Sequence, residues 1–118
     1  MKESVAETKS FAFAKDIVEM CQYLQEHKKE YIMSKQLLRS GTSIGANVAE
    51  AEYAYSKPDF YAKICIALKE ASETRYWLRL IKATGYITSK TEKSNFQTTY
   101  DACEELIRIL AAISKSKN

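Results

Sequence analysis

Residues 40–52 read SGTSIGANVAEAE and place a small residue at every fourth position, at Gly41, Gly45 and Ala49. On a helix these positions form one ridge that carries almost no side chain. Apolar residues recur beside the ridge at a spacing of about 3.5 residues: Leu37, Ile44, Val48 and Tyr55. A glycine inside a helix costs about 1 kcal/mol relative to alanine, so two of them favour close contact with another helix. The alternative is that residues 40–43 form a loop, although the apolar period is unbroken on both sides.

The composition favours helices over strands. The chain has 118 residues but only three glycines and one proline, so it has few turn signals. This length is typical of one domain, and we expect residues 1–118 to form one. The N-terminus lacks the apolar core of a signal peptide, and the longest apolar run, ICIAL at 64–68, is too short to span a bilayer. We therefore expect a cytoplasmic protein with no membrane partner.

Hydrophobic periodicity predicts four helices. The first covers about residues 8–28 and the second about 32–55. The third begins at SKPD, residues 56–59, where Ser56 can cap the helix and Pro58 suits its first turn, and it ends at Gly85. The fourth begins at SKTE, residues 89–92, a capping-box pattern. Because the connections are short, sequential helices must run antiparallel. The predicted fold is all-α, an antiparallel up-down-up-down four-helix bundle.

The cysteines and the single histidine do not form a catalytic or metal-binding pattern. Cys21, Cys65 and Cys103 are far apart, form no CxxC pair and each lie among apolar residues, which predicts reduced, buried thiols. A redox or metal role is the alternative. His27 lies in the charged run EHKKE without a sequence-local partner, which is typical of a solvated helix end.

A longer segment, residues 37–87, carries a family resemblance. It contains SIGANVAEA, DFYAKICIALKEA and ETRYWL together. In this combination the chain resembles the bacterial four-helix-bundle family encoded in intervening sequences of 23S ribosomal RNA genes. The two middle helices carry the motifs, whereas the first and fourth match in length and amphipathic pattern.

The resemblance implies a small cytoplasmic protein that assembles as a ring-like homopentamer, without an assigned catalytic activity and with association to RNA or the ribosome. The accessory protein of diversity-generating retroelements is similar in fold and ring assembly, and binds nucleic acid. The signature positions carry over as candidates for packing or binding: Asn47, Glu50, Glu70, Glu73, Arg75, Tyr76 and Trp77.

Two of these carboxylates, Glu70 and Glu73, lie one turn apart beside Trp77 on one face of the third helix. Glu50 could join them if the second and third helices pack antiparallel. We expect the acids to pair with arginines across helix or subunit contacts: Arg39, Arg75 or Arg79. The alternative, a di-metal site, would need Glu-x-x-His motifs that the chain lacks. We therefore predict no metal and no cofactor.

The net charge of +3 is too small by itself to require a nucleic-acid partner. Its distribution is more informative, because residues 27–40 hold four basic residues against Glu30, and residues 60–87 hold five against two acidic ones. The candidate nucleic-acid contacts are Lys28, Lys29, Lys35, Arg39, Arg75 and Arg79. Four tyrosines could stack on bases or fill subunit interfaces: Tyr31, Tyr53, Tyr55 and Tyr61.

Two functions follow from these observations. The first is a non-enzymatic, oligomeric protein that associates with RNA or the ribosome through basic helix faces. The second is an oligomeric scaffold for protein partners that binds no nucleic acid. An enzyme with a small-molecule substrate is not expected, because the chain has no phosphate-binding glycine loop, nucleophile elbow or metal-ligand spacing.

Overall fold

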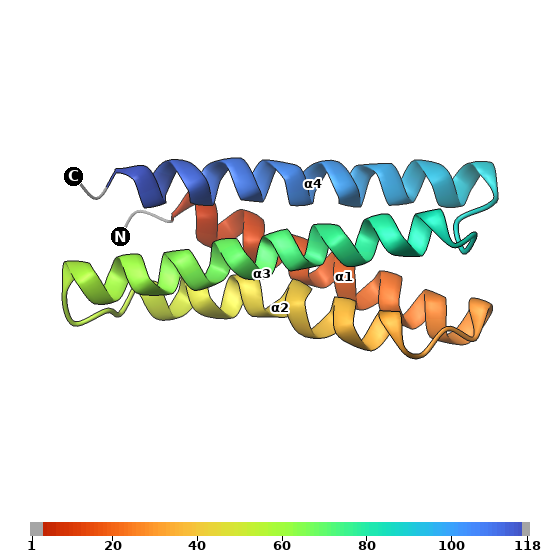
Figure 1. The fold of residues 1–118 in the computed structure, drawn as a ribbon, viewed down its shortest axis with the longest axis horizontal. Helices are drawn as coiled ribbons and strands as arrows, with labels where there is room; N and C mark the ends of the chain where they lie inside the picture. The colour runs from red at the N-terminus through yellow and green to blue at the C-terminus, as the bar shows by residue number, and fades with distance from the viewer. Residues whose placement is uncertain (1–3, 117–118) are drawn as a thin grey trace.

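The computed structural model describes residues 4–116 and confirms the predicted four-helix bundle (Figure 1). The helices are α1 (Val5–Lys28), α2 (Met33–Ala51), α3 (Lys57–Ala83) and α4 (Lys90–Lys115). Each helix packs against the next, and α4 returns to α1, so the four helices enclose one core. The bundle measures 45 × 25 × 21 Å. In the described part, no helix is long and apolar enough to cross a membrane.

Serines cap three of the four helix starts. Ser4, Ser56 and Ser89 each accept a hydrogen bond of 3.1–3.2 Å from the backbone N–H three residues later. The Glu92 carboxylate accepts in return from the N–H of Ser89 at 3.1 Å, which completes a capping box. The caps predicted at SKPD and SKTE are therefore confirmed, whereas α1 begins three residues before the predicted start.

The prediction was wrong for the end of α2, which lies at Ala51 and not near residue 55. The N–H groups of Tyr53 and Ala54 bond to carbonyls three residues back, which tightens and ends the helix. The Tyr55 side chain is fully exposed and does not extend the apolar stripe. Its N–H instead bonds to the carboxylate of Asp59, 3.3 Å away, in the first turn of α3.

Two residues in left-handed backbone conformations follow helix ends. Gly85, with φ of 90°, lies two residues after Ala83, the last residue of α3, and directly after the C-cap residue Thr84, at the predicted cap. Lys29, with φ of 55°, ends α1, and its N–H donates to the carbonyl of Leu24. These caps lie at the same end of the bundle, because α1 and α3 run in the same direction.

The core is a set of fully buried side chains, at most 2% exposed, from all four helices. The large apolar ones are Phe13, Ile17, Leu24, Leu37, Ile44, Val48, Ile64, Leu78, Ile81, Leu106 and Leu110. They recur at three- and four-residue spacing along each helix, as an inward apolar stripe requires. Burial of each side chain of this size stabilises the bundle by about 1.5–3 kcal/mol.

The glycine ridge packs against α1. A Cβ at Gly41 would lie 2.8 Å from Cγ2 of Ile17, and one at Gly45 would lie 3.4 Å from the carbonyl oxygen of Ser10. Ala49, in contrast, is exposed. A four-residue step overshoots the 3.6-residue turn by about 40°, so two steps rotate position 49 away from the contact.

The helix continues through residues 40–43, so the alternative of a loop there is wrong. The hydroxyls of this stretch bond to backbone carbonyls of the preceding turn. Thr42 donates to the carbonyl of Leu38 at 2.7 Å and Ser43 to that of Arg39 at 2.8 Å. These bonds satisfy polar side chains without breaking the helix.

Candidate nucleic-acid interface

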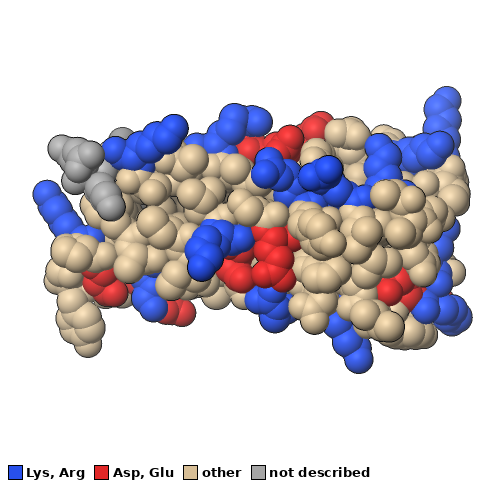
Figure 2. All heavy atoms as spheres, in the orientation of Figure 1, with Lys and Arg blue, Asp and Glu red and all other residues tan. Residues whose placement is uncertain are grey.

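One end of the bundle is basic. The α1–α2 and α3–α4 connections lie there (Figure 1), within residues 23–38 and 79–95, which we call the basic end. Of the 18 basic and 15 acidic residues of the chain, seven basic and three acidic lie at this end, which leaves eleven and twelve elsewhere. The excess positive charge of the protein therefore resides at the basic end. Lys and Arg side chains project there, at the right of Figure 2, with few acidic atoms among them.

Glu30 is one of the three acids, and it is only 6% exposed. Its carboxylate accepts from the N–H groups of Ile32, Met33 and Ser34 at 3.1, 3.0 and 2.7 Å. It thus caps α2, whose N-cap residue has no capping side chain of its own. The helix N-terminus offsets the charge of Glu30, which therefore does little to neutralise the surrounding lysines.

Glu92, the second acid, joins α1 to the start of α4. Its carboxylate accepts from the Tyr23 hydroxyl, from Lys28 Nζ at 2.9 Å and from the N–H of Thr88 at 2.9 Å. These bonds, that from Tyr23 first, hold the pKa of Glu92 well below its usual range. Lys28, a predicted nucleic-acid contact, is therefore committed to an ion pair within the bundle.

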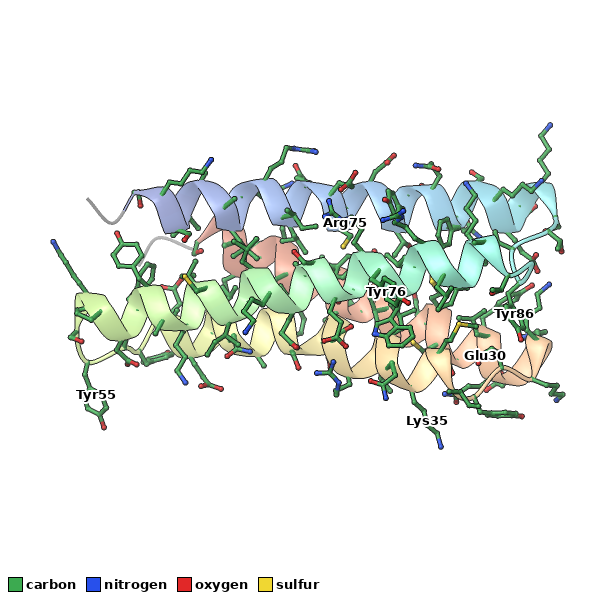
Figure 3. The ribbon with its side chains drawn as sticks, in the orientation of Figure 1. Glu30, Lys35, Tyr55, Arg75, Tyr76 and Tyr86 are labelled. Atoms are coloured by element: carbon green, nitrogen blue, oxygen red, sulfur yellow. The ribbon has the colours of Figure 1, made fainter. Side chains whose placement is uncertain are left out.

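Six other cations at the basic end are exposed and form no ion pair within residues 4–116. They are Lys29, Lys35, Arg79, Lys82, Lys90 and Lys93. Lys35 points away from the bundle (Figure 3). Lys29, Lys35 and Arg79 are contacts predicted from the sequence, whereas Lys82, Lys90 and Lys93 are not. The two lysines of α4 join this end because the fold brings the start of α4 beside the end of α1.

A hollow of about 510 Å³ lies on the α3–α4 side of the basic end. Its lining combines the cations Arg79 and Lys82 with the aromatic side chains Phe96 and Tyr100. Lys82 Nζ lies 5.7 Å from the centre of the Phe96 ring, and the rings of Phe96 and Tyr100 stack at 6.1 Å. Phe96 is only 3% exposed and forms the floor of the hollow. The half-buried Tyr100 is therefore the ring that a base could contact while Arg79 and Lys82 contact phosphate.

The carboxylate pair of α3 contacts Arg39 of α2, one of the pairings expected from the sequence. Arg39 Nη1 donates to both oxygens of Glu70 at 3.2 and 3.1 Å, and Nη2 donates to Glu73. Glu73 also accepts from Nε1 of Trp77 at 3.0 Å. The pKa of Glu73 is lowered, first by the Trp77 bond and then by the Arg39 bond. Arg39 is therefore neutralised, and acidic atoms lie at the centre of this face (Figure 2).

Arg75 is likewise paired within the chain. It extends from α3 toward α4 (Figure 3), where Nη1 lies 2.9 Å from the Glu104 carboxylate. Tyr76, its neighbour, is 54% exposed and its ring stands edge-on to Trp77, with centroids 5.2 Å apart. Of the six candidate contacts named from the sequence, Lys28, Arg39 and Arg75 are therefore engaged by carboxylates, because long-range packing brings acids to them.

Glu50 does not join the carboxylate pair. Its side chain is exposed and pairs with Lys63 Nζ at 2.9 Å, near the α2–α3 connection. Glu50 lies eleven residues along α2 from Arg39, about 16 Å at 1.5 Å per residue, and so does not reach the Arg39 cluster, which consists of Arg39, Glu70 and Glu73. Asn47, another signature position, donates to the carbonyl of Ser43 at 2.9 Å on its own helix.

The four tyrosines named from the sequence separate between the two ends. Tyr31 lies at the basic end and is 49% exposed. Tyr53 and Tyr55 lie in the α2–α3 connection at the opposite end, where Figure 3 shows Tyr55 projecting into solvent. Tyr61 is half-buried near the end of α4, 3.5 Å from Ser116 Oγ. Tyr31 is therefore the one of the four that a nucleic acid at the basic end could reach.

The thiols differ from the prediction in one case. Cys21 and Cys103 are buried, which raises the pKa of each to about 12, but Cys65 is exposed. Position 65 follows the buried Ile64 and so points about 100° away from the core. His27 is exposed in the last turn of α1 and stacks on Tyr23 at 4.6 Å. Within residues 4–116, no group of three or more His, Cys, Asp or Glu side chains could hold a metal ion.

Comparison with known proteins agrees with the motifs. The family model described as 23S rRNA-intervening sequence protein matches residues 2–112. A crystal structure from Bacteroides thetaiotaomicron, of a protein of unknown function from the S23 ribosomal protein family, is 46% identical. The match covers 95% of this chain and 100% of that chain, with a TM-score of 0.88. A search of functionally curated proteins finds no match.

Proposed function

The chain belongs to the 23S rRNA-intervening sequence protein family, and we propose that it is a non-enzymatic cytoplasmic protein that binds RNA through the basic end. The observation that carries the proposal is the charge separation described above. The basic end holds seven basic residues and three acidic ones. Two of these acids, Glu30 and Glu92, are engaged by hydrogen bonds within the fold. Lysines and arginines that face solvent without a counter-charge are suited to phosphate contacts.

The proposal includes assembly as a homo-oligomer, a pentamer by resemblance to the family. One chain presents few cations, so its phosphate contacts would be weak and strongly dependent on salt. Repetition of the basic end around a ring multiplies those contacts on one nucleic acid and raises the overall affinity without any new site. A ring of basic ends would contact the phosphate backbone and would recognise shape more than base sequence.

The test is binding of the purified protein to a structured 23S rRNA fragment and to a random DNA duplex at several salt concentrations. We expect retention of the RNA that falls steeply with salt, and a reduction of at least tenfold for the variant Lys90→Glu, Lys93→Glu. Both positions are exposed in the first turn of α4, where a carboxylate is well tolerated. Reversal of Lys28 would be less informative, because it also breaks the ion pair with Glu92.

A matched control separates local contacts from total charge. The variant Lys57→Glu, Lys69→Glu changes the net charge equally, but its positions are exposed and lie outside the basic end. We expect it to retain most of the affinity. Equal losses for both variants would show a non-specific charge effect, and failure of the wild-type protein to bind RNA at low salt would refute the proposal.

A scaffold for protein partners is the second candidate function. Exposed apolar side chains on the α2–α3 face favour it, since Ile66 is 43% exposed and Tyr76 54% exposed beside the Arg39 cluster. Aromatic side chains of this kind are enriched at protein interfaces. If RNA binding fails at low salt while the Tyr76→Ala variant loses a co-purifying protein that the wild type retains, the scaffold function would replace the first proposal.

A further inference from the structure

A second surface feature is a groove between α1 and α4. These two helices pack against each other less extensively than the other neighbouring pairs. The groove has a volume of about 520 Å³. Its apolar lining is Met20, Leu24, Ile87 and Phe96. The side chains of Leu24, Ile87 and Phe96 belong to the buried core and form a rigid floor.

The edges of the groove are acidic. Asp16 and Glu19 line it from α1, and both are exposed and form no ion pair within residues 4–116. Glu92 lines it from α4, but Lys28 already neutralises that carboxylate. The groove thus combines an apolar floor with two uncompensated carboxylates. The complementary ligand is an apolar surface flanked by cations.

The opposite flank of α1 carries such a surface. This flank of α1 faces α2. Gln25 lies on it, and its Nε2 donates to Ser34 Oγ of α2 at 3.2 Å. Phe11 and Val18 lie on the same flank, at multiples of seven residues from Gln25, and are 68% and 38% exposed. We call these two residues, together with Ala14 and the half-buried Leu38 of α2, the α1–α2 stripe.

Cations flank the α1–α2 stripe on both helices. Lys15 of α1 and Lys35 of α2 are exposed beside it. Within the described helices they outnumber the one carboxylate on this flank, that of Glu7, one turn before Phe11. The α2–α3 face also has exposed apolar residues, Ile66 and Tyr76, but the carboxylates of Glu70 and Glu73 lie among them. That face would bring acids against the acidic edges of the groove, at an electrostatic cost. Charge therefore selects the α1–α2 stripe as the better complement.

We infer that the groove between α1 and α4 receives the α1–α2 stripe of a second copy of this chain. The two surfaces lie on opposite flanks of α1 and differ from each other, so the contact is heterologous. Each copy then offers one free groove and one free stripe, and repetition of the contact closes a ring when the rotation between neighbouring copies is a whole fraction of a full turn. This inference rests on the assembly part of the proposed function and names the surfaces that form it.

Two variants that each damage one surface test the inference. Phe11→Asp places a carboxylate in the stripe, where it would meet the acidic edges of the groove. Asp16→Lys with Thr98→Lys places two cations in the groove, where they would meet Lys15 and Lys35. All the changed positions are exposed, so the fold should survive, which circular dichroism can check.

Mass measurement in the absence of RNA then gives the result. We expect a closed oligomer for the wild type and a monomer of 13.5 kDa for each variant. An equimolar mixture should give a dimer of one copy of each variant, because one intact groove meets one intact stripe and the chain of contacts ends there. Tyr76→Asp, on the α2–α3 face, is the control and should leave the oligomer unchanged.

The other outcomes overturn the inference in distinguishable ways. A monomeric wild-type protein would refute the proposed assembly, and this inference with it. Variants that keep the wild-type mass would show that the interface lies elsewhere, while assembly itself stands. A mixture without the mixed dimer would show that the two surfaces do not bind each other. None of these measurements depends on RNA binding.

Discussion

A Cβ atom at Gly41 of α2 would lie 2.8 Å from Cγ2 and 3.0 Å from Cγ1 of Ile17 of α1. Ile17 is fully buried and branched at Cβ, so neither of its γ carbons can move aside easily. Gly45, one turn further, would place its Cβ 3.4 Å from the carbonyl of Ser10, which is close to ordinary van der Waals contact. The contact between α1 and α2 therefore leaves no room for a methyl group at position 41, but it does leave room for one at position 45.

Gly41→Ala should destabilise the bundle, whereas Gly45→Ala should not. Overpacking against Ile17 costs about 1–3 kcal/mol, and the gain in helix propensity recovers about 1 kcal/mol of it, so we expect a net loss of up to about 2 kcal/mol. At Gly45 the propensity gain should dominate, with a change between about 0 and +1 kcal/mol. Urea unfolding of both variants measures the difference. Equal effects would show that α1 and α2 move apart to accommodate a methyl group at position 41.

Glu92→Gln should weaken the connection between α1 and α4. A carboxyl whose pKa is lowered by folding stabilises the protein above its ordinary pKa, and loses this effect as pH falls through the folded value. The variant should therefore have a lower Tm than the wild type at pH 7, with a difference that shrinks below about pH 4.5. Thermal unfolding from pH 7 to pH 3 checks this. A difference that does not depend on pH would mean that the charge of Glu92 is not what stabilises the connection.

Trp77 should report the protonation of Glu73. It is the single tryptophan of the chain, and its Nε1 donates to Glu73 at 3.0 Å. Because the Trp77 and Arg39 bonds lower the pKa of Glu73, Trp77 emission should change with a midpoint below the ordinary value of 4.5. Glu73→Gln should abolish this step while leaving the helical content at neutral pH intact. A step that persists in the variant would have to come from another carboxyl.

Cys65 should be the one thiol of the native protein that reacts quickly with a small maleimide. Cys21 and Cys103 are buried, and burial raises the pKa of each to about 12, so almost no thiolate forms at neutral pH. Intact-mass measurement should show one fast addition to the native wild type and none to Cys65→Ser. In denaturant, the wild-type protein should carry three labels in total, one on each cysteine. Fast addition of two labels without denaturant would show that a buried thiol becomes accessible through local opening.

The sequence predicts the helix starts of this protein well and one helix end poorly. Ser56 and Ser89 are followed by capping partners three residues later, so the signal and the bond that it forms are local. Tyr55 continues the apolar period of α2 but lies beyond the end of the helix. Periodicity identifies an apolar residue and does not show whether a neighbour is present to cover it.

The candidate interface could be predicted only in part. Lys29, Lys35 and Arg79 are exposed at the basic end, as charge patterning within short windows indicates. The capping role of Glu30 is not among the predictions, although an acid three residues before the first residue of α2 is a local signal of such a cap. The groove between α1 and α4 leaves no local signal, because its lining comes from segments more than sixty residues apart.

The four helices, their antiparallel order and the family motif follow from the sequence, because capping and amphipathic spacing act within a few residues along the chain. The tertiary structure alone shows which charges face solvent. Lys28 meets Glu92 across 64 positions, Arg39 meets Glu70 across 31, and Arg75 meets Glu104 across 29. Electrostatic interactions depend on distance in space, so only the packed bundle separates the cations that stabilise the fold from those that can bind a ligand.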